Sequence, residues 1–380
     1  MKFTTTSKEL SEVLVNMNRV INSKNSLPIL ADVVFTVKEN TLSLKASDSE
    51  NTLMTELTLA EAEGEGSFAV NAKDIMEAVK NLPDNPLSFT IDTDTDTTVN
   101  VDYFSGCFHL PIDNAIEFPA TPEISEKEAQ HFTLNEGLLQ ENIARTIFAT
   151  ADDELRPVMN GIFFDLHTNH LAVVASDGHT LVRNKIFSTT AENDEHSGNF
   201  ILPKKPSNIL KGILRRSTEA EVTMTFDGRQ VLIAAENFTM CCRLIEGRYP
   251  NYNSVIPQSN PNIVTVDRTS LIAALRRVSP FSNSNSNLVR IHMEENKMQL
   301  DTEDYDFSKT ATERIVCEYN GQPMNIGLKG SKTMEILSNI NSTEIVLQLA
   351  DPSRAALILP SEQPTDMEIT MLQMPMLLND

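Results

Sequence analysis

The sequence contains no tryptophan and only five tyrosines among its 380 residues. Proteins that hold single-stranded nucleic acid without sequence preference stack the bases on aromatic side chains, so this class is disfavoured. No apolar run approaches the ~20 residues that a membrane-spanning helix needs. The N-terminal segment Met1–Thr6 has no apolar stretch after its lysine. We therefore expect no signal peptide and a cytoplasmic location.

Cysteine is also scarce, and its spacing excludes the common zinc motifs. The four cysteines, Cys107, Cys241, Cys242 and Cys317, form no C-x-x-C pair, and structural zinc sites usually require such pairs. We expect reduced, buried thiols and no bound metal.

Several catalytic signatures are missing as well. The chain has no G-x-S-x-G nucleophile motif, and its segment 327–332 lacks the phosphate-binding G-x-x-x-x-G-K-[ST] spacing. Asp177 and His179 raise the alternative of a hydrolase, but an aspartate two residues before a histidine cannot readily orient that ring within a strand or tight turn. His167 and His170 lack an accompanying carboxylate motif and indicate a surface turn. We expect no enzymatic activity and no cofactor.

A threefold repeat organises the chain. The strand-like segments at 2–4, 131–133 and 263–265 each lead into a helical stretch, and apolar residues recur at offsets of 7 and 11 from Phe3, Phe132 and Val264. Those offsets lie on one face of a helix. A second strand–helix pattern begins near Phe68, Phe200 and Met324.

The repeat predicts an α+β fold of three like domains, each with two strand–helix half-units among alternating strands. The predicted domains are 1–127, 128–258 and 259–380.

Positive charge is scarce overall, but it is concentrated in the predicted helices. The net charge of −22 argues against a nucleic-acid partner. However, the six predicted helical windows hold 16 of the 31 basic residues and only 7 of the 53 acidic ones. The windows are 7–24, 71–82, 134–147, 204–216, 268–280 and 329–339. Six weakly basic helices on one surface would attract a phosphate backbone without reading its sequence.

Five strings in the second and third thirds of the chain and near its start carry a family resemblance. They are Leu27–Leu30 (LPIL), Met159–Gly161 (MNG), Ala175–Leu181 (ASDGHTL), Glu246–Tyr252 (EGRYPNY) and Met374–Leu378 (MPMLL). Together with the repeat, they make the chain resemble, from end to end, the bacterial sliding clamps, the beta subunits of DNA polymerase III.

The resemblance implies a processivity factor. Members are head-to-tail homodimeric rings with sheets outside and helices lining a hole for duplex DNA. Their partners are a clamp loader and replicative and repair DNA polymerases. The subunit interface would join strand edges near Val99–Leu110 and Val278–Ile291, with Phe281 as an apolar anchor.

The resemblance also implies a pocket between the second and third domains that takes a short extended partner peptide of the type Gln-x-x-Leu-Phe. Its residues would be Met159, Ser176, Gly178, His179, Thr180, Leu181, Pro250, Ser254, Val255, Leu372, Met374, Pro375 and Met376.

For DNA, the resemblance carries over Lys24, Lys73 and Arg156, and the charge count adds Arg145, Lys204, Lys205, Lys211, Arg276 and Arg277. Three departures from the family affect the expected partner affinity and peptide preference: Thr180 in place of the usual arginine, Lys332 in place of an aromatic residue, and Leu377 where arginine is often the fourth residue of the tail string. A scaffold protein with three like domains and no role on DNA is the alternative in another class.

Overall fold

A computed structural model describes residues 1–378 except 23–26, 93–96, 125–128 and 218. The chain forms two compact units. The first comprises Met1–Gln140 and Lys205–Leu244, and the second Glu141–Lys204 and Ile245–Asp380. Each unit therefore draws on more than one of the predicted domains. The predicted boundary at residues 127–128 lies outside the described residues.

In the described part of the chain, each of the six α-helices follows directly on a strand, as the sequence predicts. The helices are α1 (Ser7–Met17), α2 (Ala72–Val79), α3 (Glu136–Thr146), α4 (Lys204–Ile213), α5 (Arg268–Val278) and α6 (Gly330–Ser338). Polar side chains cap several of their first turns: Asp267 Oδ1, for example, accepts a hydrogen bond from the Ser270 amide at 2.7 Å. Helix α1 ends at Met17, well before residue 24, and Val20 behind it is buried.

Short 3-10 helices connect many of these elements. They are η1 (Pro28–Ala31), η2 (Ala115–Glu117), η3 (Ile147–Ala149), η4 (Pro157–Met159), η5 (Asp194–His196), η6 (Tyr252–Val255) and η7 (Ser279–Phe281).

The first unit contains one antiparallel sheet of thirteen strands. In order across the sheet they are β10 (Gln130–Asn135), β15 (Glu221–Phe226), β16 (Gln230–Ala235), β17 (Thr239–Arg243), β4 (Asn51–Thr58), β3 (Thr41–Ser47), β2 (Asp32–Lys38), β6 (Gly66–Asn71), β9 (Gly106–Asp113), β8 (Thr98–Tyr103), β7 (Pro86–Thr90), β1 (Lys2–Thr6) and β5 (Glu61–Glu63). Strand β9 joins β6 through only two residue pairs, Ala69–Asp113 and Val70–Ile112. Among the described residues, the rest of this edge of β9 has no neighbouring strand.

The second unit contains two antiparallel sheets. The eight-stranded sheet has the order β14 (Gly198–Pro203), β11 (Gly161–Leu166), β12 (Leu171–Ser176), β13 (Thr180–Ile186), β25 (Met367–Gln373), β24 (Ala356–Pro360), β23 (Glu344–Leu349) and β18 (Asn262–Asp267). The four-stranded sheet has the order β21 (Lys309–Val316), β20 (Lys297–Asp304), β19 (Leu288–Glu294) and β22 (Met324–Lys329).

The edge of the four-stranded sheet corrects one expectation. The segment Val278–Ile291 was expected to supply a strand edge for subunit contact. Its strand part, the start of β19, pairs with β20 on one side and β22 on the other, so both of its edges are occupied. Strands β21 and β22 are the edge strands instead, and the residues of β21 alternate between exposed and half-buried along most of its length.

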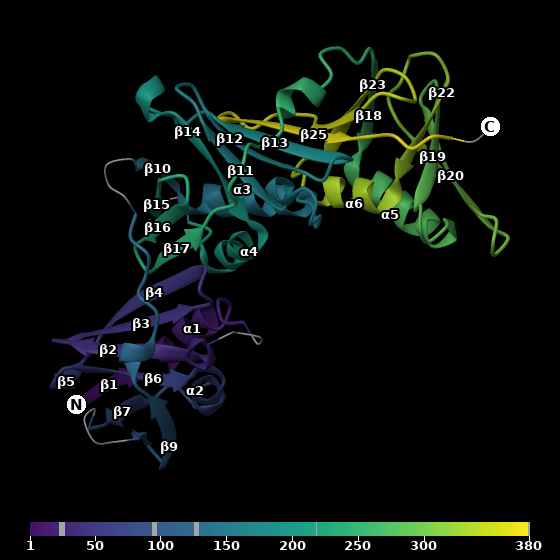
Figure 1. The fold of residues 1–380 in the computed structure, drawn as a ribbon. Coiled ribbons are helices and arrows are strands. Elements are labelled where there is room, and N and C mark those ends of the chain that lie inside the picture. Colours follow the sequence, from purple (N-terminus) through teal and green to yellow (C-terminus); the bar gives the residue numbers. More distant parts are fainter. Residues whose placement is uncertain (23–26, 93–96, 125–128, 218, 379–380) are drawn as a thin grey trace. The chain divides into compact units, whose positions relative to one another are not determined.

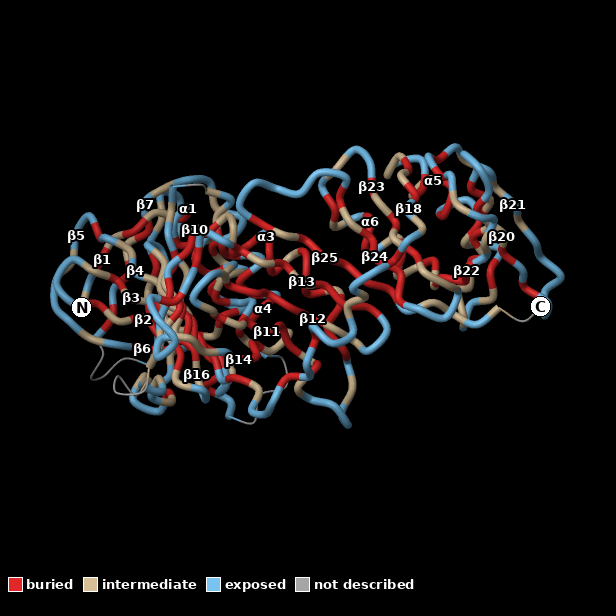
Figure 2. The backbone as a smooth tube through the Cα atoms, turned by 90° about the horizontal axis from the view of Figure 1, so that it is seen from above, coloured by how far each residue is buried: buried red, intermediate tan, exposed pale blue. Residues whose placement is uncertain are grey.

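The cores lie where each sheet meets its helices. Helix α1 packs against α2, and α5 packs against α6. In the ribbon, α1 and α2 lie together on one face of the neighbouring strands (Figure 1). Buried residues follow the strands in both units, while the turns are exposed (Figure 2). In the first unit Phe3 stacks on Phe89 with ring centroids 4.6 Å apart. These observations confirm the predicted α+β class.

The cysteines are free, but not all of them are buried. Cys241, Cys242 and Cys317 are buried, and burial raises the pKa of the Cys242 thiol. Cys107 is exposed, because it lies on β9 where no described strand covers the second edge, and its side chain points away from the core. The expectation of burial is therefore wrong for Cys107. No helix in the described part of the chain is long and apolar enough to cross a membrane.

Candidate partner pocket and cationic surfaces

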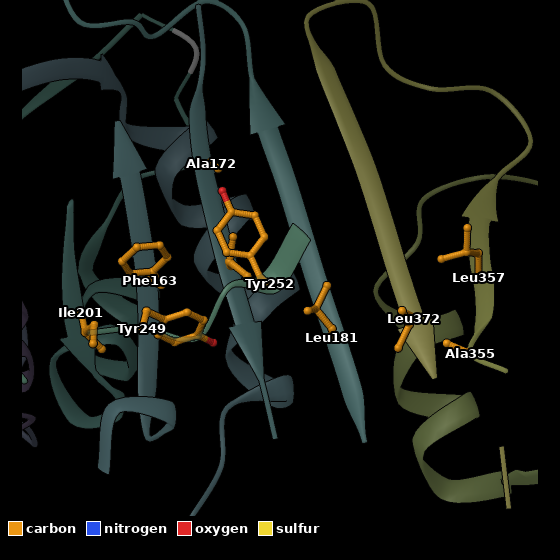
Figure 3. Close-up of a cluster of buried hydrophobic side chains, with 10 residues drawn as sticks. Phe163, Ala172, Leu181, Ile201, Tyr249, Tyr252, Ala355, Leu357 and Leu372 are labelled. Carbon is orange, nitrogen blue, oxygen red and sulfur yellow. The ribbon is translucent and has the colours of Figure 1, made fainter. Parts of the chain in front are cut away.

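An apolar cluster forms on the outer face of the second unit's eight-stranded sheet, where β13 meets β25. Leu181 on β13 lies directly opposite Leu372 on β25, and Leu372 lies opposite Leu357 on β24. All three are buried in one cluster with Phe163, Ile201, Tyr249 and Tyr252 (Figure 3). Two of the predicted pocket residues, Leu181 and Leu372, therefore come together although 191 positions separate them.

Two tyrosines from the EGRYPNY string form one wall of this cluster. The ring of Tyr249 stacks on Phe163 with centroids 4.5 Å apart, and Tyr252 meets the same ring edge-on at 6.1 Å. The Tyr252 hydroxyl donates to Asp165 Oδ2 at 2.9 Å. Burial raises the pKa of both tyrosines, so they remain neutral and apolar on their ring faces.

The Asp177–Gly178–His179 string forms the turn between β12 and β13. Asp177 Oδ1 accepts hydrogen bonds from the amides of His179 (2.9 Å) and Thr180 (2.6 Å). Gly178 has φ +90°, and a Cβ there would lie 3.0 Å from the guanidinium of Arg156. The carboxylate thus closes a turn and does not orient the exposed His179 ring, so the geometry gives the hydrolase hypothesis no acid–histidine pair.

The C-terminal tail is held by backbone hydrogen bonds to the turn before β13 and to β22. The Met374 amide donates to the His179 carbonyl at 2.7 Å, and the Met376 amide donates to the Gly327 carbonyl at 2.8 Å. Gln373 binds the Lys329 carbonyl at 3.0 Å through its side chain. The tail therefore continues β25 and adds a single bridge to the edge of β22.

A cavity of about 560 Å³ opens beside the tail. Its lining includes two of the predicted pocket residues, Val255 and Met374. It also includes Pro257, Gln258, Ser259, Ser353, Arg354 and Ala355, which sequence reasoning missed. Residues 353–355 lie in the turn that precedes β24, and only the pairing of β24 with β25 brings this turn to Met374.

The remaining predicted pocket residues differ in their surroundings. Ser176 closes the turn through its hydroxyl, and Pro250 and Ser254 are exposed near Tyr252. Pro375 and Met376 are half-buried in the tail, and Met159 is buried. Thr180 is a correction: its side chain is 1% exposed and lies opposite Gln373, on the face of the sheet that Leu181 does not share.

The absence of a side chain at Gly327 leaves room for the C-terminal tail to pack against β22. A Cβ at this position would lie 2.7 Å from the Met376 carbonyl oxygen and 2.8 Å from the Leu378 side chain. We expect Gly327→Val to release the tail beyond Gln373. Hydrogen exchange should then become faster at the Met376 amide. Gly228→Asn should leave that amide protected, because asparagine tolerates the φ of +87° at this position and an added Cβ meets nothing within 4 Å. An unchanged exchange rate in Gly327→Val would show that the bridge does not hold the tail.

The predicted DNA-facing cations fall into two groups. Lys73, Lys211 and Arg276 are exposed, and none of them forms an ion pair with another described residue. Others are neutralised by a neighbour: Lys204 by Asp152 at 2.7 Å, Arg156 by Asp153 at 2.8 Å and Arg277 by Glu313 at 2.7 Å. Lys24 lies outside the described residues.

Two of the cations have structural roles that the sequence did not indicate. Arg145 is buried, with 4% of its side chain exposed. It pairs with Glu141 one helical turn earlier and donates to the Asn339 carbonyl. Its assignment as a DNA-facing residue is therefore wrong. Lys205 binds Asp48 and also donates to the Val20 carbonyl at 2.8 Å, so its charge is taken up within the first unit.

Comparison with known proteins decides the family. Three family models cover nearly the whole chain: the N-terminal domain of the DNA polymerase III beta subunit at residues 1–122, the central domain at 133–251 and the C-terminal domain at 253–377. The chain belongs to the DNA polymerase III beta subunit family, the beta sliding clamps. The family resemblance is thereby confirmed.

Individual relatives agree over their full length. The chain is 27% identical to the beta sliding clamp of Synechococcus elongatus over 99% of both chains. Its structure matches that of the DNA polymerase III subunit beta from Pseudomonas aeruginosa with a TM-score of 0.92, 26% identity and complete coverage of both chains. It matches the Thermotoga maritima beta subunit with a TM-score of 0.88 at 28% identity, again over both complete chains. One matching P. aeruginosa structure is of a sliding clamp bound to griselimycin.

Proposed function

We propose that two copies of this chain close head to tail into a ring around duplex DNA, and that the ring tethers DNA polymerases and other partners through the cavity beside Met374. In this role the protein is a non-enzymatic processivity factor that a clamp loader places on DNA in the cytoplasm. The observation that carries the proposal is a repeated strand junction, by which we mean the antiparallel pairing of two strands from different thirds of the chain. Two such junctions are formed within the chain, and the strands for a third are present but do not pair with each other.

The two complete junctions are alike. In the first unit β17 pairs antiparallel with β4, and Met240 lies opposite Leu53. In the second unit β25 pairs antiparallel with β13, and Met371 lies opposite Val182. Each of these four side chains is buried. The first strand of each junction follows a strand with a buried residue opposite the methionine, Ile233 or Ile358.

The third pair of strands is present but separate. Strand β9 matches β17 and β25, because Phe108 lies opposite the buried Val101 of β8. Strand β21 matches β4 and β13, because Ala311 lies opposite the buried Thr302, as Leu53 lies opposite Ala46. Both strands have edges that no described strand covers. A second copy supplies the missing strand for each, and the repeat then places Phe108 opposite Ala311.

Exposed apolar residues mark the same two strands. Phe104 is 91% exposed just before β9, and Val316 is 81% exposed at the end of β21. In the register set by Phe108 and Ala311, Phe104 falls opposite Ile315, next to Val316. Phe281, the predicted anchor, is 40% exposed in η7, which contacts β21. Such a heterologous contact closes into a ring when the rotation between subunits allows it.

The DNA role rests on the unpaired cations. Lys211 lies on helix α4 and Arg276 lies on helix α5, so helices and not strands carry both cations. Because the proposed ring encloses DNA instead of gripping it, a few unpaired cations suffice for a weak, sequence-independent contact that permits sliding.

The proposal is tested by native mass and by retention on DNA. We expect a particle of about twice 42.3 kDa at micromolar concentration. After loading by its clamp loader, the protein should stay on nicked circular duplex DNA and leave the same DNA once it is linearised. A monomer at that concentration would contradict the ring. Equal, rapid loss from circular and linear DNA would contradict encirclement and favour the scaffold alternative.

A further inference from the structure

Both complete junctions carry a lysine beside the paired strands. In the first unit Lys205, the second residue of α4, pairs with Asp48 Oδ2 and donates to the Val20 carbonyl at 2.8 Å. In the second unit Lys332, the third residue of α6, lies 3.6 Å from Asp177 Oδ2 and donates to the Phe148 carbonyl at 3.2 Å, while its nearer carboxylate is Glu335 on its own helix at 3.0 Å. Val20 and Phe148 each follow the end of a helix, α1 or α3, by two or three residues.

The two aspartates occupy the same place in the repeat. Asp48 follows β3 and Asp177 follows β12, each two residues beyond a buried alanine, Ala46 or Ala175. In both, Oδ1 closes the turn by accepting backbone amides, from Asn51 at 2.7 Å or Thr180 at 2.6 Å. Oδ2 is therefore the oxygen left for the lysine.

The third set of residues exists, but its members do not meet within the described chain. Asp304 lies two residues beyond the buried Thr302 and is itself only 4% exposed, and its Oδ1 accepts the Asp306 amide at 3.1 Å. No hydrogen bond to its Oδ2 is present among the described residues. Lys73 is the second residue of α2, as Lys205 is of α4, and it is exposed.

We propose that Lys73 is a subunit-contact residue whose ammonium group pairs with Oδ2 of Asp304 in the second copy, at the junction where β9 meets β21. This assignment rests on the proposed ring and replaces the expectation that Lys73 faces DNA. By the same repeat, the ammonium group of Lys73 also donates to the carbonyl of Pro280 or Phe281 in the second copy. These two residues follow the end of α5 by two and three positions, as Phe148 follows α3 and Val20 follows α1.

The turn that carries Asp304 is also built to reach further than its two counterparts. Strands β20 and β21 pair up to Asp304 and Lys309, which leaves four residues in the loop, where the turn after Asp177 leaves two. Two of the four are aromatic and exposed: Tyr305 at 82% and Phe307 at 70%. A contact with a second copy gives these rings a surface to cover.

The surface around Lys73 has room for that loop. A cavity of about 1150 Å³ lies at the start of α2, and its lining includes Ala72, Lys73, Met76, Pro28 and Asp113. Asp113 ends β9, so the cavity continues from the strand edge that β21 is proposed to occupy. Tyr305 and Phe307 of the second copy enter here, against the apolar side chains of Met76 and Pro28.

The test compares two lysines in the full-length protein. Lys73→Met should raise the dimer dissociation constant about tenfold at low salt, because each dimer contains the ion pair twice. The matched control is Lys211→Met, which removes an exposed, unpaired lysine from α4 and should leave the constant unchanged. Asp304→Asn retains the turn-closing oxygen, and it should weaken the dimer no further when combined with Lys73→Met.

Three outcomes would overturn the assignment. One is a wild-type dissociation constant in Lys73→Met together with a lower salt dependence of DNA binding, which would return this lysine to the DNA surface. The second is equal weakening by both lysine variants, which would indicate a general effect of charge. The third is additive weakening by Lys73→Met and Asp304→Asn. A wild-type protein that is itself monomeric would instead refute the ring, so the two failures are distinguishable.

Discussion

Thr312→Cys should convert the dimer into a covalent species under mild oxidation. The register that places Phe108 opposite Ala311 also places Cys107 opposite Thr312, on the outer face, where Thr239 lies opposite Met54 in the complete junction. Directly opposite residues in an antiparallel pair have Cα atoms ~4.5–5.5 Å apart, which suits a disulfide. Because Cys107 is the exposed cysteine and the other three are buried, the native thiol is the available partner.

The product should be read on a non-reducing gel. A closed ring gives covalent dimers and nothing larger, whereas an open head-to-tail chain gives a ladder of higher oligomers. Ala311→Cys is the control, because its side chain faces the helices and should not form the bond. Cys107→Ser combined with Thr312→Cys should also fail to cross-link.

The same variant can report on encirclement. If oxidation follows loading onto circular duplex DNA, the closed covalent ring should remain on that DNA in detergent, because it is linked topologically and not by contacts. Complete release in detergent, with dimers still covalent on the gel, would mean that the ring does not enclose the duplex.

A pair of acids, Asp32 on β2 and Asp113 on β9, should make the stability of the protein depend on pH. Burial raises the pKa of Asp32 to about 6, and a hydrogen bond with Asp113 together with that residue's charge adds to the shift. Asp32 on β2 lies opposite Asn71, and Asp113 on β9 lies opposite Ala69, so the two acids lie at the ends of the two strands that flank β6. The folded state therefore binds a proton at Asp32 more tightly than the unfolded chain does.

The protonated form of Asp32 is the one that favours the folded state. The contribution of Asp32 to stability is fully present below the unfolded pKa of 3.8 and is lost as the pH rises through about 6. A shift of this size corresponds to roughly 2–3 kcal/mol. We expect Asp32→Asn to lack this loss. Its free energy of unfolding relative to wild type should rise by about 2 kcal/mol between pH 4.5 and pH 7.5.

Urea unfolding of both proteins at the two pH values measures this difference, and effects common to the whole chain cancel in the comparison. The negative charge of Asp74 also raises the pKa of Asp32, but it is the smallest of the causes. Lys73, Glu77 and Lys205 line the cavity at the start of α2 together with Asp32. Asp74→Asn is therefore the control and should change the difference little. A constant difference between wild type and Asp32→Asn would show that Asp32 titrates alike in both states.

The repeat made much of the fold predictable. The spacing of apolar residues after Phe3, Phe132 and Val264 placed three helices and their preceding strands, because helix and strand periods differ and leave distinct patterns. Helix ends were less accessible: α1 stops at Met17 although the apolar and basic residues continue. Which strand forms an edge was not predictable either, because β19 and β21 both alternate, and only long-range pairing decides which one is covered.

In the candidate site, residues that lie close together in the sequence were easier to predict than contacts between residues that lie far apart in it. The turn at Asp177 and the two tyrosines that contact Phe163 lie within the short strings ASDGHTL and EGRYPNY, so the residues involved were visible in the sequence, although their packing was not. Arg145 and Lys205 were assigned by charge alone. Charge count cannot separate a solvated cation from one held by Asn339 or Asp48, residues that lie 194 and 157 positions away. Ser353 and Ala355 gave no signal, because a short polar turn becomes a cavity wall only when β24 pairs with β25.

Two of the three strand junctions form within one chain and the third forms between chains, and this difference has an energetic consequence. Two are held by chain connectivity, so their strands meet at a high effective concentration and tolerate weak contacts. The seam between β9 and β21 must instead offset the loss of translational and rotational freedom on association. A two-membered ring contains two such seams: opening the ring breaks one, and separating its subunits breaks both. A substitution at either strand should therefore affect the free energy of full dissociation twice as strongly as the free energy of opening.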